Sequence, residues 1–160
     1  YWDEPERPIQ KNGFEAQMEL ARETKLPMVI HSRDAAKDTE DMMRAARAEE
    51  IGGVVHCFSY PKEMARKFLD MGFYLGIGGV VTFKNSRTLK EVVSYAPLDR
   101  ILLETDSPYL SPEPNRGKRN SSLNLPYVAE QIAALKGIST KEVIEVTEQN
   151  ARNMYRMKEV

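Results

Sequence analysis

Three short apolar runs of the chain are each followed closely by a polar residue that can bind a metal ion. Residues 27–30 lead into His31, residues 53–55 lead into His56, and residues 101–103 lead into Glu104 and Asp106. A run without polar positions predicts a strand that is buried on both faces, as in a parallel sheet. In parallel α/β sheets the functional side chains gather beyond the carboxyl ends of the strands. The pattern therefore predicts that these side chains share one rim of a sheet.

The segments between these runs have the spacing of amphipathic helices. We expect helices over residues 12–23, 37–49, 61–71, 88–95, 126–136 and 139–146, and a short closing helix over 150–155. The helix that follows Ser139 begins with a sequence that resembles a capping box. Residues 73–79 predict a fourth strand, whose glycines let another backbone or a ligand approach closely. Residues 1–8 and 111–125 predict loops.

Strands and helices that alternate at intervals of about 20 to 30 residues predict βαβ units and a parallel sheet. We expect an α/β fold with about four parallel strands, formed by a single domain over residues 1–160. The sequence has no glycine-rich phosphate-binding fingerprint, and the glycines at positions 76, 78 and 79 lack the spacing of a dinucleotide-binding loop.

Composition places the chain among soluble globular proteins, with 41% hydrophobic and 29% charged residues. Its formal net charge of -1 argues against a strongly basic nucleic-acid-binding module. An enzyme that acts on nucleic acid stays compatible with that charge, because a metal and a local patch can hold phosphate. The single cysteine leaves no internal disulfide, and we expect a cytoplasmic location. No apolar run approaches membrane-spanning length, so no membrane partner is expected.

The two histidines of the chain, His31 and His56, both follow matching apolar runs. With Asp106 they predict a site for a divalent metal, which imidazole nitrogens and a carboxylate bind well. The alternative is a pair of core histidines and a capping aspartate, but the repeated pattern favours metal ligands. Glu104 would point to the same side as Asp106. It is a candidate catalytic carboxylate beside Asp106, a partner of the ligands, or a solvated acid. We interpret Cys57 as buried packing and not as a nucleophile.

Several polar residues near the predicted rim are candidates for substrate binding. Arg116, Lys118 and Arg119 form a short basic cluster in the loop after Asp106, which either grips phosphate or is simply solvated. Lys84 follows the glycine-containing strand and could act in the same way. Arg33 either orients phosphate or forms a structural ion pair, and Tyr109 either stacks on a base or packs.

Together these motifs resemble the TatD family of metal-dependent deoxyribonucleases. The matching segments are residues 29–35, 53–59, 103–110 and 116–120, in the order and spacing of the family. The resemblance covers nearly the whole chain. It implies a TIM-barrel fold related to the amidohydrolases, with His31, His56 and Asp106 as metal ligands. It also implies two divalent ions (Mg, Mn or Zn) in the intact family. The implied reaction is hydrolysis of DNA phosphodiesters by metal-activated water. The implied activity is that of a 3′-5′ exonuclease that acts on single-stranded ends.

The chain also departs from the family pattern. The His-x-His pair of the family's first strand and its metal-bridging Glu motif are absent, and that Glu motif normally ends just before a pair like Tyr1-Trp2. The chain therefore resembles the carboxyl-terminal part of such an enzyme, a partial barrel without its first strands. We expect it to bind metal weakly or at a single site and to have little or no activity alone. After Asn120 the family often has Glu-Pro, where this chain has Ser121-Ser122.

Two alternative functions are compatible with the sequence. One is another amidohydrolase-like enzyme that acts on a lactone, an amide or a phosphotriester, although no lysine ends a predicted core strand as a carbamylated lysine would. The other is a non-catalytic half-barrel that serves as a binding module, for which loss of His31 or Asp106 would change nothing.

Overall fold

The computed structural model describes residues 5–157, and at its centre lies a four-stranded parallel sheet in the order β1-β2-β3-β4. The strands are β1 (Met28–His31), β2 (Gly53–His56), β3 (Tyr74–Ile77) and β4 (Ile101–Leu103). The predicted number and direction of the strands are confirmed. Among the described residues the sheet remains open and does not close into a barrel.

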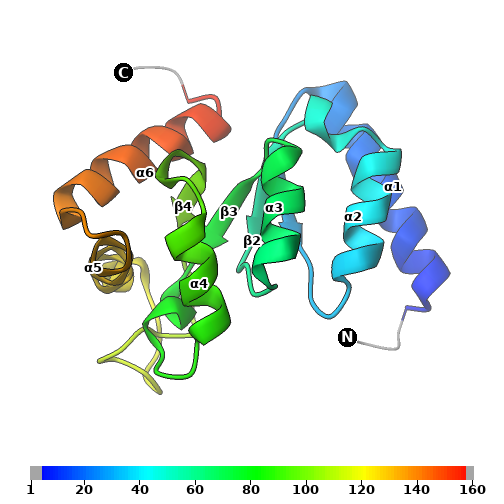
Figure 1. Ribbon diagram of the computed structural model, residues 1–160. Coiled ribbons are helices and arrows are strands. Elements are labelled where there is room, and N and C mark those ends of the chain that lie inside the picture. The colour runs from blue at the N-terminus through cyan, green and yellow to red at the C-terminus, as the bar shows by residue number, and fades with distance from the viewer. Residues whose placement is uncertain (1–4, 158–160) are drawn as a thin grey trace.

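Each pair of neighbouring strands is connected through a helix, as the alternating pattern predicted. The helices are α1 (Arg7–Thr24), α2 (Ala36–Ala45), α3 (Lys62–Asp70), α4 (Arg87–Tyr95), α5 (Leu125–Lys136) and α6 (Thr140–Met154). Figure 1 shows α1 and α2 near the β1 end of the sheet and α5 and α6 near the β4 end. No helix within residues 5–157 combines the length and apolar character needed to cross a membrane.

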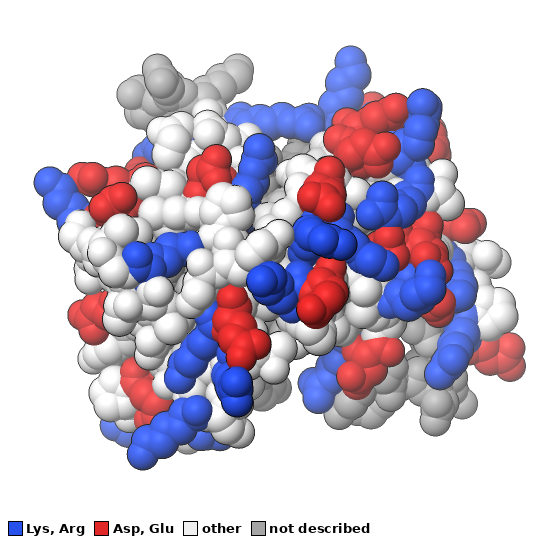
Figure 2. All heavy atoms as spheres, in the orientation of Figure 1, with Lys and Arg blue, Asp and Glu red and all other residues white. Residues whose placement is uncertain are grey.

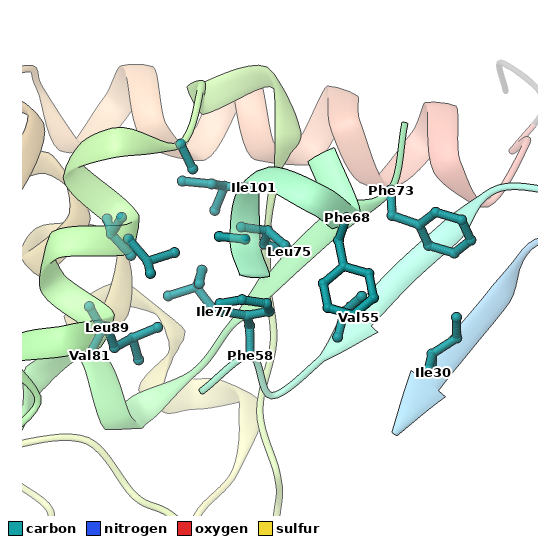
Figure 3. Close-up of a cluster of buried hydrophobic side chains, with 14 of the residues drawn as sticks. Ile30, Val55, Phe58, Phe68, Phe73, Leu75, Ile77, Val81, Leu89 and Ile101 are labelled. Carbon is teal, nitrogen blue, oxygen red and sulfur yellow. The ribbon is translucent and has the colours of Figure 1, made fainter. Parts of the chain in front are cut away.

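One face of the sheet forms the main hydrophobic core. Ile30, Val55, Leu75 and Ile101 lie in register on neighbouring strands and are almost fully buried. Figure 3 shows them with buried aromatic side chains, among them Phe68 of α3. Burial of each such side chain contributes roughly 1.5 to 3 kcal/mol, so this face holds the helices on the sheet.

The opposite face carries the histidines. Val29 and Val54 alternate with the core residues and are paired in register, and the next residues on that side are His31 and His56. Val54 is buried in a small cluster with Met154 of α6, whereas Val29 is 56% exposed. The difference follows from position, because β1 is the edge strand of the described sheet.

The backbones of β1 and β2, the strands that carry the histidines, lie in close contact at Gly53. Gly53 has a φ of 152° and pairs with Met28, and a methyl group at Gly53 would overlap the Met28 backbone. Only glycine avoids both the overlap and the backbone strain. The first residue of β2 therefore sets how closely β1 can lie beside it.

The sequence placed several helix boundaries wrongly. Helix α1 begins at Arg7 and not at residue 12, because a proline such as Pro8 is tolerated in the first turn, where its missing N–H would have no partner. The predicted helix over 37–49 ends at Ala45, and a short 3-10 turn (Ala48–Glu50) follows Arg47, whose φ is 50°. Residues 1–4 of the first predicted loop lie outside the described residues.

The last helix is also longer than predicted. We expected two separate helices over 139–146 and 150–155, but α6 is continuous. The Thr147 hydroxyl donates to the Val143 carbonyl four residues earlier, so this polar residue is satisfied inside the helix. The capping prediction is confirmed for Ser139, whose side chain accepts a hydrogen bond from the Glu142 N–H.

Candidate metal centre

The register of β1 and β2 places the two histidines side by side. His31 pairs with His56, and their ring centroids are 6.1 Å apart with an interplanar angle of 39°. His31 is exposed at the sheet edge, whereas the His56 side chain is only 20% exposed. The more buried imidazole, that of His56, has the larger number of polar contacts among the described residues and is the centre of the site.

The Glu104 carboxylate holds His56 from one side. One of its oxygens lies 2.7 Å from His56 Nδ1, and the other accepts a hydrogen bond from the Cys57 N–H. The carboxylate lies directly over Gly76, where a methyl group would come within 2.5 to 2.6 Å of its three atoms. The absence of a side chain at Gly76 therefore makes room for Glu104.

These contacts determine which nitrogen of His56 carries the proton. An ionised carboxylate only accepts hydrogen bonds, so His56 Nδ1 must be the donor to Glu104. In the neutral imidazole the lone pair is then on Nε2, which faces Asp106 Oδ1 at 3.4 Å. Two acceptor atoms in this arrangement repel each other unless a cation, either a proton or a metal ion, lies between them.

The pKa of His56 lies above its ordinary value. The largest cause is the hydrogen bond to Glu104, which outweighs the lowering by burial, and the charges of Glu104 and Asp106 act in the same direction. The pKa of the Cys57 thiol is also raised, to about 11, but here burial is the largest cause and repulsion by Glu104 and Asp106 adds to it. The thiol stays protonated at neutral pH, in agreement with the interpretation of Cys57 as packing.

The chemistry of the donor set fits a divalent metal at the pair of His56 Nε2 and Asp106. The nitrogen lone pair and the carboxylate converge, and the other ring nitrogen is oriented by a carboxylate, as is usual for metal-binding histidines. Within residues 5–157, however, no three His, Cys, Asp or Glu side chains form a group ready to hold an ion. His31 is the neighbouring candidate for a third ligand, and it remains a prediction.

The candidate substrate residues lie in separate places: beside His31, in the loop after Asp106, and near α3 and α4. Arg33 lies 4.0 Å from Asp34 and lines, with His31, a cavity of about 600 Å³. Tyr109 is 70% exposed in the loop after Asp106. The Arg116 guanidinium stacks 4.3 Å from the ring centroid of Phe83, and Lys118 and Arg119 are exposed. Lys84 lies apart from these residues, in a groove beside α3 and α4.

Buried asparagines, which the sequence reasoning missed, shape the loop that follows Asp106. Asn120 is 3% exposed, its side chain donates to the Tyr109 carbonyl, and its N–H donates to the Pro108 carbonyl. Asn124 donates to Asn120 Oδ1 and accepts from Asn115. These hydrogen bonds fix the backbone that presents Tyr109. The signal in the sequence was three asparagines in a proline-rich loop, where solvation was the simpler interpretation.

Comparison with known proteins shows the family to which the chain is similar. A family model described as TatD related DNase matches residues 1–156. The chain is 46% identical over 157 residues to the uncharacterized metal-dependent hydrolase YabD of Bacillus subtilis (strain 168), covering 98% of this chain and 62% of that protein. It is 33% identical over 151 residues to a protein of Rahnella sp. (strain Y9602) named 3'-5' ssDNA/RNA exonuclease TatD, covering 91% and 57%.

The fold has a solved counterpart. The crystal structure of YjjV, a TatD homolog from Escherichia coli K12, superposes with a TM-score of 0.91 at 25% identity, covering 99% of this chain and 61% of that one. The chain spans about three fifths of the length of the curated relatives it matches.

Proposed function

This chain belongs to the TatD related DNase family, and on that basis we propose that it takes part in metal-dependent hydrolysis of phosphodiester bonds at the 3′ end of single-stranded DNA. The observation that carries the proposal is the convergence of His56 Nε2 and Asp106 Oδ1, 3.4 Å apart, with His56 held by Glu104. The name of the Rahnella relative supports a single-stranded substrate, and it leaves RNA as a second substrate of the same site.

His56 and Asp106 would hold a divalent ion (Mg, Mn or Zn), with His31 as a further ligand. Such an ion supplies Lewis acidity at a phosphoryl oxygen and lowers the pKa of a bound water molecule. Glu104 keeps the proton of His56 on Nδ1 and so keeps the Nε2 lone pair available. Asp106 contributes negative charge, which stabilises a cation between the two side chains.

The residues around the pair would bind the substrate. Arg116, Lys118 and Arg119 present positive charge on the loop after Asp106, as a chain of phosphates requires. Arg33 would contact phosphate from the side of His31. The exposed ring of Tyr109 offers a surface on which a terminal base can stack.

The test is a single-turnover assay with an excess of this chain over a 5′-labelled single-stranded oligonucleotide, with Mg, Mn or Zn and with EDTA. We expect slow, metal-dependent shortening from the 3′ end. EDTA should abolish it, and Asp106→Asn should slow it by about 100-fold or more, since the substitution removes a ligand charge. Products that do not depend on metal, shortening from the 5′ end, or faster hydrolysis of a phosphotriester or lactone would contradict the proposal.

A further inference from the structure

A basic groove lies on the outside of α3 and α4, apart from the His56–Asp106 pair. Its volume is about 870 Å³. Its lining residues are Lys62, Lys84, Arg87, Lys90, Glu91, Ser94 and Tyr95. We call this the α3–α4 groove. Figure 2 shows Lys and Arg side chains, with Asp and Glu side chains among them, over the part of the surface that these two helices form.

The charge of the groove contrasts with that of the chain. The formal net charge of the whole chain is -1, whereas four of the groove's lining residues are cationic and one is acidic. That acid, Glu91, is already bound to Arg87 at 3.0 Å. Among the described residues, Lys62 and Lys84 form no ion pair with a carboxylate. The groove therefore presents uncompensated positive charge to a ligand.

An aromatic ring accompanies these cations. Tyr95 is 40% exposed, and the Lys62 ammonium lies 4.7 Å from its ring centroid. Cations that follow a phosphate backbone, together with an aromatic ring on which a base can stack, are typical of sites for single-stranded nucleic acid. An acidic peptide would use the charges but would gain little from the ring.

The groove is connected to the loop that follows Asp106. Lys90 Nζ donates to the Phe83 carbonyl at 2.7 Å, and Arg116 stacks on the other part of the same residue, its ring. The Glu113 N–H donates to the Thr82 hydroxyl at 2.8 Å and fixes the two segments against each other. Cationic groups thus follow one another from the loop, across Phe83, into the groove.

From this continuity we propose that the α3–α4 groove binds the phosphodiester backbone of single-stranded nucleic acid, several nucleotides away from the end held at His56 and Asp106. The inference rests on the proposed function for the direction of the strand. It adds a second binding site, which makes affinity depend on substrate length. A dinucleotide at the His56–Asp106 pair would be too short to use it.

The test is the affinity of this chain for fluorescein-labelled single-stranded DNA of 2 and 12 nucleotides, measured by anisotropy in EDTA so that hydrolysis does not interfere. The variant is Lys62→Gln/Lys84→Gln/Arg87→Gln, whose residues are all exposed. The matched control is Arg47→Gln/Lys141→Gln/Arg152→Gln, which removes the same charge outside the groove. Circular dichroism confirms that both variants are folded.

We expect the groove variant to bind the 12-mer about 10-fold or more weakly than the wild type, and the control to stay within about 2-fold. Each lost phosphate contact should also reduce the slope of log affinity against log salt by roughly 0.7 for a single strand. Tyr95→Ala should weaken binding of the 12-mer without changing the slope of log affinity against log salt, because stacking does not release counterions.

Three results would overturn the proposal. The first is an equal loss of affinity for the 12-mer in the groove variant and in the control. The second is binding of the 12-mer that is no tighter than binding of the dinucleotide. The third is an affinity for poly-glutamate equal to that for DNA of the same charge, which would indicate a site for acidic proteins. The proposed function fails separately, if the assay above gives products that do not depend on metal while the groove variant still binds the 12-mer more weakly than the control in EDTA.

Discussion

The Glu104 carboxylate performs two tasks at once, since one oxygen accepts from the Cys57 backbone and the other from His56. No feature of the sequence distinguished this arrangement from a solvated acid, because the pairing joins residues 48 positions apart. The sequence did indicate Glu104 as a candidate partner of the ligands. The space that Glu104 needs, above Gly76, depends on strand register and became visible only in the structure.

Replacing Glu104 by Gln should reverse the tautomer of His56. The Gln amide would donate to Nδ1, which moves the imidazole proton to Nε2 and removes the lone pair that faces Asp106. In an NMR spectrum without metal, we expect Nδ1 of His56 to show the ¹⁵N chemical shift of a protonated nitrogen in the wild type, and Nε2 to show it in Glu104→Gln. Metal affinity should fall by about 10- to 100-fold.

Only two histidines contribute imidazole signals, so His31 is the internal control for that spectrum. Its signals should not move in Glu104→Gln. Unchanged His56 signals would mean that the carboxylate does not select the tautomer. A variant that binds metal normally would mean that the selection has no effect on the site.

A methyl group at Gly76 should displace the Glu104 carboxylate and so disturb His56 from a distance. We expect Gly76→Ala to shift the same His56 signals and to lower the free energy of unfolding by about 2 kcal/mol through overpacking. The matched control is Gly13→Ala in α1, where the added methyl group meets nothing within 4 Å. Chemical denaturation and the NMR spectrum of both variants check this prediction.

At the scale of elements, the predicted strands were right and the ends of several helices were wrong. Fully apolar runs such as Ile101–Leu103 specify buried strands because few other environments accept them. Helix ends depend on weaker, local effects: Pro8 fits within a first turn, and Thr147 is satisfied within α6. The loop after Asp106 could not be predicted, since its shape depends on hydrogen bonds among buried asparagines.

Glu40 joins two helices through a buried carboxylate. It lies on α2 with its side chain 6% exposed, accepts a hydrogen bond from Arg44 of the same helix, and accepts another from Lys67 of α3 at 3.0 Å. The hydrogen bond from Arg44, followed by that from Lys67, holds the pKa of Glu40 below its ordinary value. The contact therefore stabilises the packing of α2 on α3 more strongly when Glu40 is ionised than when it is protonated.

Stability should consequently fall at acidic pH in a way that depends on Glu40. The pKa of Glu40 is lower in the folded chain than in the unfolded chain. The contribution of Glu40 to the free energy of unfolding is therefore complete at pH values above the ordinary pKa of glutamate, and it is lost as the pH falls from there through the lowered pKa of the folded chain. We expect Glu40→Gln to cost about 1 to 2 kcal/mol at pH 7 and progressively less toward pH 3 in urea denaturation. Glu145→Gln on the exposed side of α6 should show neither effect; a constant cost for Glu40→Gln at every pH would contradict the prediction.

At the scale of the whole molecule, the described sheet presents an open edge at β1. Leu26 is 61% and Val29 is 56% exposed beside it. A cavity of about 410 Å³ lies between β1 and α1, lined largely by apolar residues. Exposed strand edges with apolar side chains tend to pair with other chains. The alternation of strands and helices specified the parallel sheet, but it contains no information on whether such a sheet closes.

The open edge predicts self-association of this chain in solution. We expect its weight-average mass in sedimentation experiments to rise with concentration, and Val29→Lys to suppress that rise, because an edge lysine opposes strand pairing. The control is Leu123→Lys, because Leu123 is 85% exposed but lies away from this edge. A rise that persists in Val29→Lys, or that disappears equally in Leu123→Lys, would assign the association to another surface.

The close contact at Gly53 has a consequence for variation in this chain. Since a side chain there would push β1 away from β2, it would also separate His31 from His56, although position 53 touches neither imidazole. In a saturation library of all codons at position 53, selected for binding to an immobilised divalent metal, glycine should be almost the sole survivor. Exposed positions near it, such as Glu50, should tolerate many replacements. Intolerance at position 53 would then show that metal binding depends on the spacing of β1 and β2 as well as on the ligands.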